Sequence, residues 1–307
     1  MTRLERALAD YLTIRRAMGY KLEREGRLLP RFVDYLAEHG ADTVTTELAL
    51  AWATATPAAS VSWHSNRLGM VRGFAAYLHT LDGRAEVPSS DWLPSGRRRA
   101  TPYLYSDADL AALMAAAGAL RTPLRAATYQ TLIALLAVTG MRVGEAIAVD
   151  RDDVDFKAGV LIVRHGKFDK ARELPLHAST LGALRDYLDR RDRPHPPASS
   201  ALLVSIAGTR LIYKNVARTF IALTRAAGLR PRSASCRPRP HDLRHSFAVR
   251  TLIDAYHADG DVQPRASLLS TYLGHVDPAD TYWYLSAAPE LLVLAGERLQ
   301  RHLDDQQ

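Results

Sequence analysis

Apolar side chains recur every three or four residues through the N-terminal part of the chain, a spacing that predicts amphipathic helices. Residues 4–14 and 28–36 carry this pattern. Thr45 or Thr46 can accept a hydrogen bond from the first turn of a third helix, and Ser60 can do the same for a longer fourth helix. We therefore expect this part of the chain to be helical throughout.

The helical pattern stops at residues 88–103, where proline, glycine and serine replace the apolar repeat. This composition is typical of a linker between two folded parts. We expect a helical domain over residues 1–87 and a second domain over residues 104–307.

The second domain begins with two more helical patterns. Ser106 is followed by acidic residues in the expected first turn, as at a capped helix N-terminus. Another helix is expected from Thr122 to Val138, and Gly140 follows it as a residue that readily ends a helix.

The periodicity changes to that of strands between residues 150 and 176. Two short runs, 159–164 and 172–176, flank a turn that contains glycine, which predicts an antiparallel hairpin. From Ser179 to about Arg301 we expect helices only. The predicted fold class is mainly α with a small antiparallel β-sheet, as a helical N-terminal domain followed by a mixed α/β domain.

Composition restricts where the protein works. The chain of 307 residues has one cysteine, Cys236, so it cannot form an intrachain disulfide, and a reducing compartment suits it. The uncharged, apolar-leaning run at residues 126–141 includes polar residues and is shorter than the roughly 20 apolar residues of a membrane span. We expect this run to be a buried core helix, and the protein to be cytoplasmic, with no membrane partner.

The net charge of +7 is confined to one part of the chain. Residues 1–95 hold 11 basic and 11 acidic side chains, so the remaining residues carry the whole excess. A basic domain attracts polyanions such as nucleic acid, although an arginine-rich composition from a GC-rich genome gives the same count. The triplet of Arg97, Arg98 and Arg99 is either a solvated part of the linker or a strap on a DNA backbone.

Two arginines in the second domain have the surroundings of phosphate ligands. A planar guanidinium matches the oxygens of a phosphodiester with paired hydrogen bonds. Arg142 follows the Thr139-Gly140 break and opens a helix, where backbone amides add to the affinity for an anion. Arg244 lies three residues after His241.

A candidate nucleophile follows these arginines, since Tyr284 lies nine residues after His275. A phenol with a pKa of about 10 is a weak nucleophile at neutral pH, so nearby cations have to favour its anion. If the tyrosine, the histidines and the arginines converge in space, they form a site that can attack a phosphodiester.

These fragments, taken in order, resemble the tyrosine recombinase (phage integrase) family. The resemblance spans residues 142–284, and the helical N-terminal part resembles the core-binding domain of that family in pattern only. It implies a site-specific recombinase that cleaves and rejoins double-stranded DNA, without a cofactor, to integrate, excise or resolve a mobile element. The matching fragments are Thr139-Gly140-Met141-Arg142-Val143-Gly144-Glu145, Gly166-Lys167, His241-Asp242-Leu243-Arg244-His245-Ser246-Phe247-Ala248, Leu273-Gly274-His275 and Tyr284.

The resemblance also implies a role for each matching residue. Tyr284 is the implied nucleophile, which forms a 3′-phosphotyrosine and frees a 5′ hydroxyl. Lys167 is implied to protonate the departing 5′ oxygen, and Glu145 is implied to support the site. The implied cluster around the phosphate consists of Arg142, His241, Arg244 and His275.

Two of these assignments have competitors. Lys170 is an alternative to Lys167 as the general acid, because the turn between them departs from the lysine-glycine turn common in the family. Tyr272 and Tyr282 compete with Tyr284 as the nucleophile, and spacing from the preceding histidine is what separates them.

Other functions fit parts of the same pattern. His241 and His245 are four residues apart and could share a helix face as metal ligands, but Asp242 stands where a metallohydrolase motif has glutamate, and Arg244 would repel a cation. A type IB topoisomerase shares the tyrosine chemistry, and a DNA-binding protein without catalysis could share the fold.

The last predicted helix starts at Pro289 and ends near Arg301. It either packs on its own domain or, as the resemblance implies, docks on a neighbouring protomer. In the second case the protein forms a synaptic tetramer on DNA that carries its recombination sites, and it is associated with the nucleoid when bound.

Overall fold

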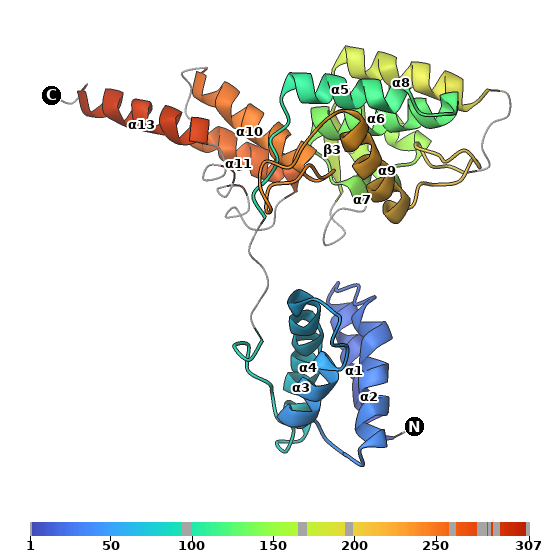
Figure 1. The fold of residues 1–307 in the computed structure, drawn as a ribbon, viewed down its shortest axis with the longest axis vertical. Coiled ribbons are helices and arrows are strands. Elements are labelled where there is room, and N and C mark those ends of the chain that lie inside the picture. Colours follow the sequence, from blue (N-terminus) through green and yellow to red (C-terminus); the bar gives the residue numbers. More distant parts are fainter. Residues whose placement is uncertain are drawn as a thin grey trace. The chain divides into compact units, whose positions relative to one another are not determined.

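The computed structural model divides the chain into two compact units, Met1–Arg99 and Ala100–Gln307. Figure 1 shows the helices of each unit. Residues of the expected linker pack on both units, since Leu93 lies against the first core and Tyr103 is buried in the second. The structure describes residues 2–93, 100–164, 171–193, 199–257, 262–274, 281, 284 and 289–304.

The described residues of the first unit form four helices, and the third and fourth start at caps that the sequence predicts. Thr45 and Ser60 each accept a hydrogen bond from a backbone N–H three residues later, at 3.3 and 3.2 Å. Thr2 forms a reciprocal capping box with Glu5. The helices are α1 (Arg3–Ala17), α2 (Glu25–Glu38), α3 (Thr46–Thr54) and α4 (Val61–Leu81).

Aromatic side chains fill the core of this unit. Phe32 and Trp52 pack with ring centroids 5.1 Å apart, and Tyr11 and Phe74 pack at 5.8 Å. Each buried ring removes a large apolar area from water. The first unit therefore has a hydrophobic core of its own.

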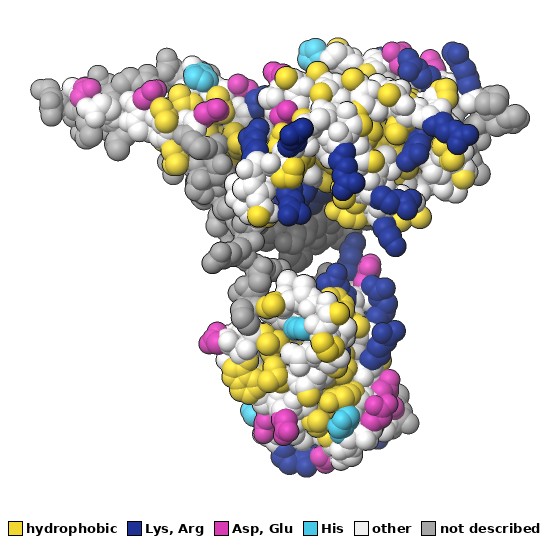
Figure 2. Space-filling view, viewed as in Figure 1, with side chains coloured by type: hydrophobic (Ala, Val, Ile, Leu, Met, Phe, Trp, Pro, Cys, Tyr) yellow, Lys and Arg dark blue, Asp and Glu magenta, His cyan; other side chains and the backbone are white. Residues whose placement is uncertain are grey.

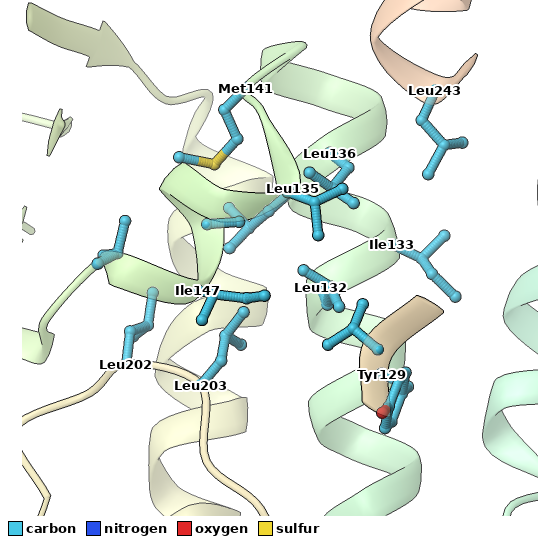
Figure 3. Packing of buried hydrophobic residues seen from close by; sticks show 14 of the residues in the cluster. Tyr129, Leu132, Ile133, Leu135, Leu136, Met141, Ile147, Leu202, Leu203 and Leu243 are labelled. Atoms are coloured by element: carbon cyan, nitrogen blue, oxygen red, sulfur yellow. The ribbon is translucent and has the colours of Figure 1, made fainter. Parts of the chain in front are cut away.

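The second unit is built around one buried helix, α6 (Pro123–Thr139). Figure 3 shows Leu132, Ile133, Leu135 and Leu136 of this helix among side chains from other elements, and each of the four is 1% exposed. A helix that is apolar on most sides belongs in a core, so the predicted core helix is confirmed. Its neighbours are α5 (Asp107–Gly118), α7 (Val143–Ala148), α8 (Ala178–Arg191) and α10 (Asp242–His257).

A second apolar cluster forms where α10 meets two later helices. It includes Leu252, Leu273 and Leu291, all almost fully buried. Among the described helices, none has the length and apolar character needed to cross a bilayer. The helices described in this unit also include α9 (Tyr213–Ala226), α11 (Val262–Leu273) and α13 (Pro289–Asp304).

The predicted hairpin is confirmed, and a short strand that the sequence does not predict adds to it. Leu161 lies opposite Leu174, and Val163 lies opposite Arg172. The three apolar members of these pairs are buried, so the sheet has a core-facing side. The fold class, mainly α with a small antiparallel sheet, is confirmed. The strands, in sheet order, are β1 (Val154–Asp155), β2 (Val160–Val163) and β3 (Arg172–Pro175).

The expectation of helices only after Ser179 is wrong in two places. Residues 199–212 contain no helix, and Ala201 instead forms an antiparallel bridge with Asp150. A short apolar run does not distinguish a strand from a helix. Residues 227–241 are also non-helical, because their several prolines lack the N–H that a helix needs and clash with its preceding turn.

Gly140 joins the end of α6 to the helices around it. Its backbone is left-handed, with φ +60°, as expected for a glycine that ends a helix. A Cβ at this position would collide with the Phe247 ring and would lie 3.1 Å from Leu273. Both the conformation and the close approach therefore require glycine.

Gly140→Ala should lower the free energy of unfolding of the second unit by about 2–5 kcal/mol, because a left-handed backbone costs about 1–2 kcal/mol and overpacking adds about 1–3 kcal/mol. Gly228→Ala is the matched control. Gly228 is also left-handed, with φ +72°, but nothing lies within 4 Å of its Cβ position, so the steric cost is absent. Urea denaturation measures both variants, and equal losses would contradict the steric role of Gly140.

Candidate active site

Arg142 is held at the N-terminus of α7 by Glu145, one turn into that helix. The Arg142 backbone N–H donates to Glu145 Oε2 at 2.8 Å, and its Nη1 donates to Oε1 at 2.8 Å. The carboxylate thus satisfies a backbone N–H that the helix leaves without a partner. The Arg142 side chain keeps 27% of its surface exposed, and its Nη2 donates to the Gly274 carbonyl at 3.3 Å.

A second arginine, which the sequence analysis does not identify, binds the same carboxylate. Arg172 donates from Nη2 to Glu145 Oε2 at 2.7 Å and from Nη1 to Oε1 at 3.1 Å. Burial raises the pKa of Glu145, but the hydrogen bonds from Arg172 and Arg142 outweigh it and lower that pKa to about 2. Glu145 is therefore a fixed anion between two cations at neutral pH.

The strand pattern of the sequence already indicates that Arg172 is partly buried. Leu174 and Leu176 are both buried, so the alternation of a strand puts Arg172 on the same side. A charged residue on the apolar side of a strand has to find a partner of opposite charge. The hairpin residues beyond it, including Lys167 and Lys170, lie outside the described residues.

Arg244 is a buried cation at the centre of the site, 2% exposed. Its Nη1 donates to the Gly140 carbonyl at 2.8 Å, and its Nη2 donates to the Leu273 carbonyl at 2.7 Å. These oxygens lie at the C-terminal ends of α6 and α11, where helix dipoles favour a cation. Burial and the charge of Arg142 lower the pKa of Arg244 to about 10, which leaves it protonated at neutral pH.

The first turn of α10, which carries Arg244 and directly follows His241, is anchored by an ion pair. Asp242 is fully buried and accepts from Arg239 Nη2 at 2.9 Å and from Arg239 Nε at 3.0 Å. Burial raises the pKa of Asp242 although these hydrogen bonds oppose the shift. Asp242 belongs to the motif that begins at His241, whereas Arg239 lies outside every matching fragment. The pair fixes the direction in which the neighbouring site residues point.

His241 is solvent-accessible, yet it stands among many protein atoms and several cations. Desolvation, followed by repulsion from Arg244, Arg142 and Arg239, lowers its pKa to about 4. The accessible edge lets the ring reach a substrate, while the surrounding charge keeps it unprotonated. His241 is therefore a neutral imidazole at pH 7, able to accept a proton.

Tyr284 lies next to these groups with its ring 2% exposed. The His245 ring packs against it edge to face, with centroids 5.3 Å apart, and contacts the His241 ring at 4.7 Å. Tyr284 raises the pKa of Arg244, mainly through the charge of its phenolate and further through a hydrogen bond, and so helps to keep the arginine charged. The tyrosine is thus directly linked to the buried cation.

Of the other predicted residues, Tyr272 has a packing role, and the rest lie outside the described residues. Tyr272 stacks on Phe247 with centroids 5.7 Å apart, and burial raises its pKa. Outside the described residues lie Lys167, Lys170, His275, Tyr282, Arg97, Arg98 and Arg99.

The described cluster is strongly cationic. Arg142 and Arg172 bind the Glu145 carboxylate, and Arg244 adds a third guanidinium, so with His241 neutral these groups carry a net charge of +2. Such a cluster suits a phosphate that gains negative charge in its transition state. Within the part of the chain that the structure describes, no group of three or more His, Cys, Asp or Glu side chains is arranged to hold a metal ion.

Comparison with known proteins extends this picture. The model of the phage integrase family matches residues 105–290. A putative integrase/recombinase, y4rB, of Sinorhizobium fredii (strain NBRC 101917 / NGR234) is 45% identical over 99% of each chain. Tyrosine recombinase XerC of Azotobacter vinelandii (strain DJ / ATCC BAA-1303) is 34% identical, over 72% of this chain and 70% of its own length.

Solved structures share the fold. The crystal structure of XerA recombinase has a TM-score of 0.52 at 23% identity and covers 98% of this chain and 99% of its own. The Tn1549 transposon integrase, in complex with transposon right end DNA, has a TM-score of 0.63 at 18% identity and covers 98% and 100%. The family model and the curated relatives go further than the fold, and they confirm the resemblance seen in the motifs: this chain belongs to the phage integrase family, the tyrosine recombinases.

Proposed function

We propose that this chain is a site-specific recombinase that cleaves and rejoins double-stranded DNA through a covalent 3′-phosphotyrosine on Tyr284. Membership of the tyrosine recombinases supports the reaction class. The observation that supports the residue assignment is the position of Tyr284 in the cationic cluster. Its buried ring lies 5.3 Å from the His245 ring between centroids, and Tyr284 raises the pKa of the buried Arg244 through its charge and a hydrogen bond. A role in moving a genetic element agrees with the integrase/recombinase relative.

The buried arginine acts on both reacting groups. Its described backbone partners are neutral carbonyls, so the full charge of Arg244 remains available to a phosphate oxygen and to the developing Tyr284 phenolate. Arg142 adds a second, partly exposed guanidinium. Fixed cations in a buried site stabilise the extra negative charge of the transition state without reorganising.

The proton and bond changes balance without a metal or a nucleotide. The Tyr284 oxygen forms a bond to phosphorus while its proton passes to neutral His241, directly or through water. The bond from phosphorus to the 5′ oxygen breaks, and Lys167 protonates that oxygen. The reverse reaction with a 5′ hydroxyl from another strand rejoins the DNA, since the phosphotyrosine conserves the energy of the phosphodiester.

The DNA-binding surface extends beyond the site. Figure 2 shows Lys and Arg side chains gathered on the part of the second unit that holds α9, where Lys214 and Arg218 are exposed. Such a face attracts the phosphate backbone. We assign residues 1–87 to a core-binding domain, residues 88–103 to a linker that carries the triplet Arg97–Arg99, and residues 104–307 to the catalytic domain.

The C-terminal helix is the proposed contact between protomers. Leu291 of α13 is 1% exposed and fixes the helix on its own unit, whereas Leu292 and Val293 are 58% and 59% exposed. Adjacent exposed apolar side chains are typical of a protein–protein contact. In this proposal the helix couples the subunits of a synaptic tetramer on DNA.

Tyr284→Phe should abolish the covalent adduct formed on a nicked suicide substrate, because the hydroxyl oxygen is the nucleophile. The assay is run in EDTA and read by denaturing gel electrophoresis. Tyr272→Phe and Tyr282→Phe are the controls, and both should still form the adduct. An adduct that persists in Tyr284→Phe and disappears in Tyr282→Phe would show that Tyr282, and not Tyr284, is the nucleophile.

Arg244→Lys should slow cleavage by about 100- to 1,000-fold, the range for loss of one fixed donor to a transition-state oxyanion. Affinity for the DNA site should change only a few-fold, because many other phosphate contacts remain. Arg250→Lys, on the same helix but in an exposed pair with Asp107, is the control and should cleave normally. Single-turnover rates and gel-shift titrations test this, and a loss of binding as large as the loss of rate would contradict the assignment.

His241 should titrate well below the usual histidine range in free protein, with a pKa of about 4. Desolvation and the nearby guanidiniums disfavour its protonated form, so it stays neutral from pH 8 down through pH 5. Histidine NMR resonances, assigned by comparison with His241→Gln, measure the midpoint. A midpoint near 6.5 would contradict the electrostatic picture, and added DNA should raise the value because a phosphate favours the cation.

A further inference from the structure

We propose that Arg172 is a positioning residue that fixes the direction and the available charge of Arg142. The proposal rests on the proposed function, because it concerns how the first clamp arginine is presented to the phosphate. It assigns a role to the β-sheet that goes beyond carrying the hairpin.

Arg172 completes the set of donors around Glu145. The carboxylate receives four N–H groups: the backbone N–H and Nη1 of Arg142 at 2.8 Å each, and Nη1 and Nη2 of Arg172 at 3.1 and 2.7 Å. Each oxygen accepts one bond from each arginine. A carboxylate held from two sides in this way cannot rotate to follow Arg142, so it defines where the Arg142 guanidinium lies.

The same arrangement decides how much positive charge is left for the substrate. With Arg172 in place, a single negative charge is shared by two guanidiniums. Without it, Glu145 would neutralise Arg142 alone, and the partly exposed Arg142 side chain would be a weaker phosphate ligand. Arg172 is itself only 13% exposed, so its charge acts mainly through this carboxylate.

Arg172 also touches the other partner of Arg142. The Gly274 carbonyl accepts from Arg142 Nη2 at 3.3 Å, and the Arg172 guanidinium packs on Gly274, 3.2 Å from the position of a Cβ. Gly274 is left-handed, with φ +68°, which only glycine adopts readily. Arg172 is thus in contact with both groups that hold the Arg142 side chain.

Single-turnover cleavage of the suicide substrate tests this role with a double-mutant cycle. Arg172→Lys keeps the charge but lacks the planar pair of donors that holds both carboxylate oxygens in a fixed direction, and it should slow cleavage by about 10- to 100-fold, as expected for a misplaced catalytic group. Combined with Arg142→Lys it should add less than about threefold, because Arg172 acts through the residue already changed. Additive losses would overturn the proposal.

A second substrate separates this role from a role in the hairpin. When sulfur replaces the 5′ bridging oxygen, the thiolate leaves without a proton, so the loss caused by Lys167→Ala should shrink. The loss caused by Arg172→Lys should remain, because it arises at the phosphate. If the sulfur substrate restores the cleavage rate of Arg172→Lys, the arginine acts through the general acid, and the proposal is wrong.

Two variants guard against a purely structural effect. Arg164→Lys alters another arginine–carboxylate pair, with Asp153, at the base of the same hairpin, and it should cleave within threefold of wild type. An equal loss there would mean that hairpin stability, not contact with the clamp, is responsible. If Arg172→Lys yields too little folded protein, Glu145→Gln replaces it in the cycle as a test of positioning alone: it removes the paired contacts that orient Arg142, and its loss combined with Arg142→Lys should again add less than about threefold. Failure of the wild type to form an adduct would instead refute the proposed function itself.

Discussion

The second unit depends on the burial of one cation, Arg244, with helix-end carbonyls for partners. A guanidinium in the interior loses its hydration, and the loss must be compensated by hydrogen bonds with good geometry. Gly140 and Leu273 provide them from the ends of two helices that are distant in sequence. Because these partners are neutral, the charge is stabilised in place without being cancelled, which is what a phosphate-binding site requires.

This constraint explains the packing around the site. The ends of α6 and α11 have to approach α10 closely, and Gly140 permits it where any side chain would collide with Phe247. Gly274, which directly follows Leu273, allows the Arg172 guanidinium a similarly close approach. Two carboxylates, Glu145 and Asp242, then hold the other arginines. Catalytic geometry and domain stability therefore rely on the same few contacts, so a change in one disturbs the other.

Much of the architecture follows from local patterns. The caps at Thr45, Ser60 and Ser106 and the hairpin could be predicted because hydrogen bonding and periodicity within a few residues decide them. The helical pattern expected after Ser179 does not hold at residues 199–212 and 227–241. The first is a short buried run without a distinctive period, and the second contains prolines that break a helix. Arg172 was missed because its partner, Glu145, is 27 residues away along the chain.

The kind of chemistry could be predicted from the amino-acid sequence alone. Guanidinium, imidazole and phenol groups occur in an order specific to the family, and residue identity and spacing are local properties of the chain. Which charges are free to act depends on the three-dimensional arrangement. The desolvation of Arg244, the depressed pKa of His241 and the sharing of Glu145 between two arginines depend on burial and on distances between remote segments, and no pattern along a single chain contains those quantities.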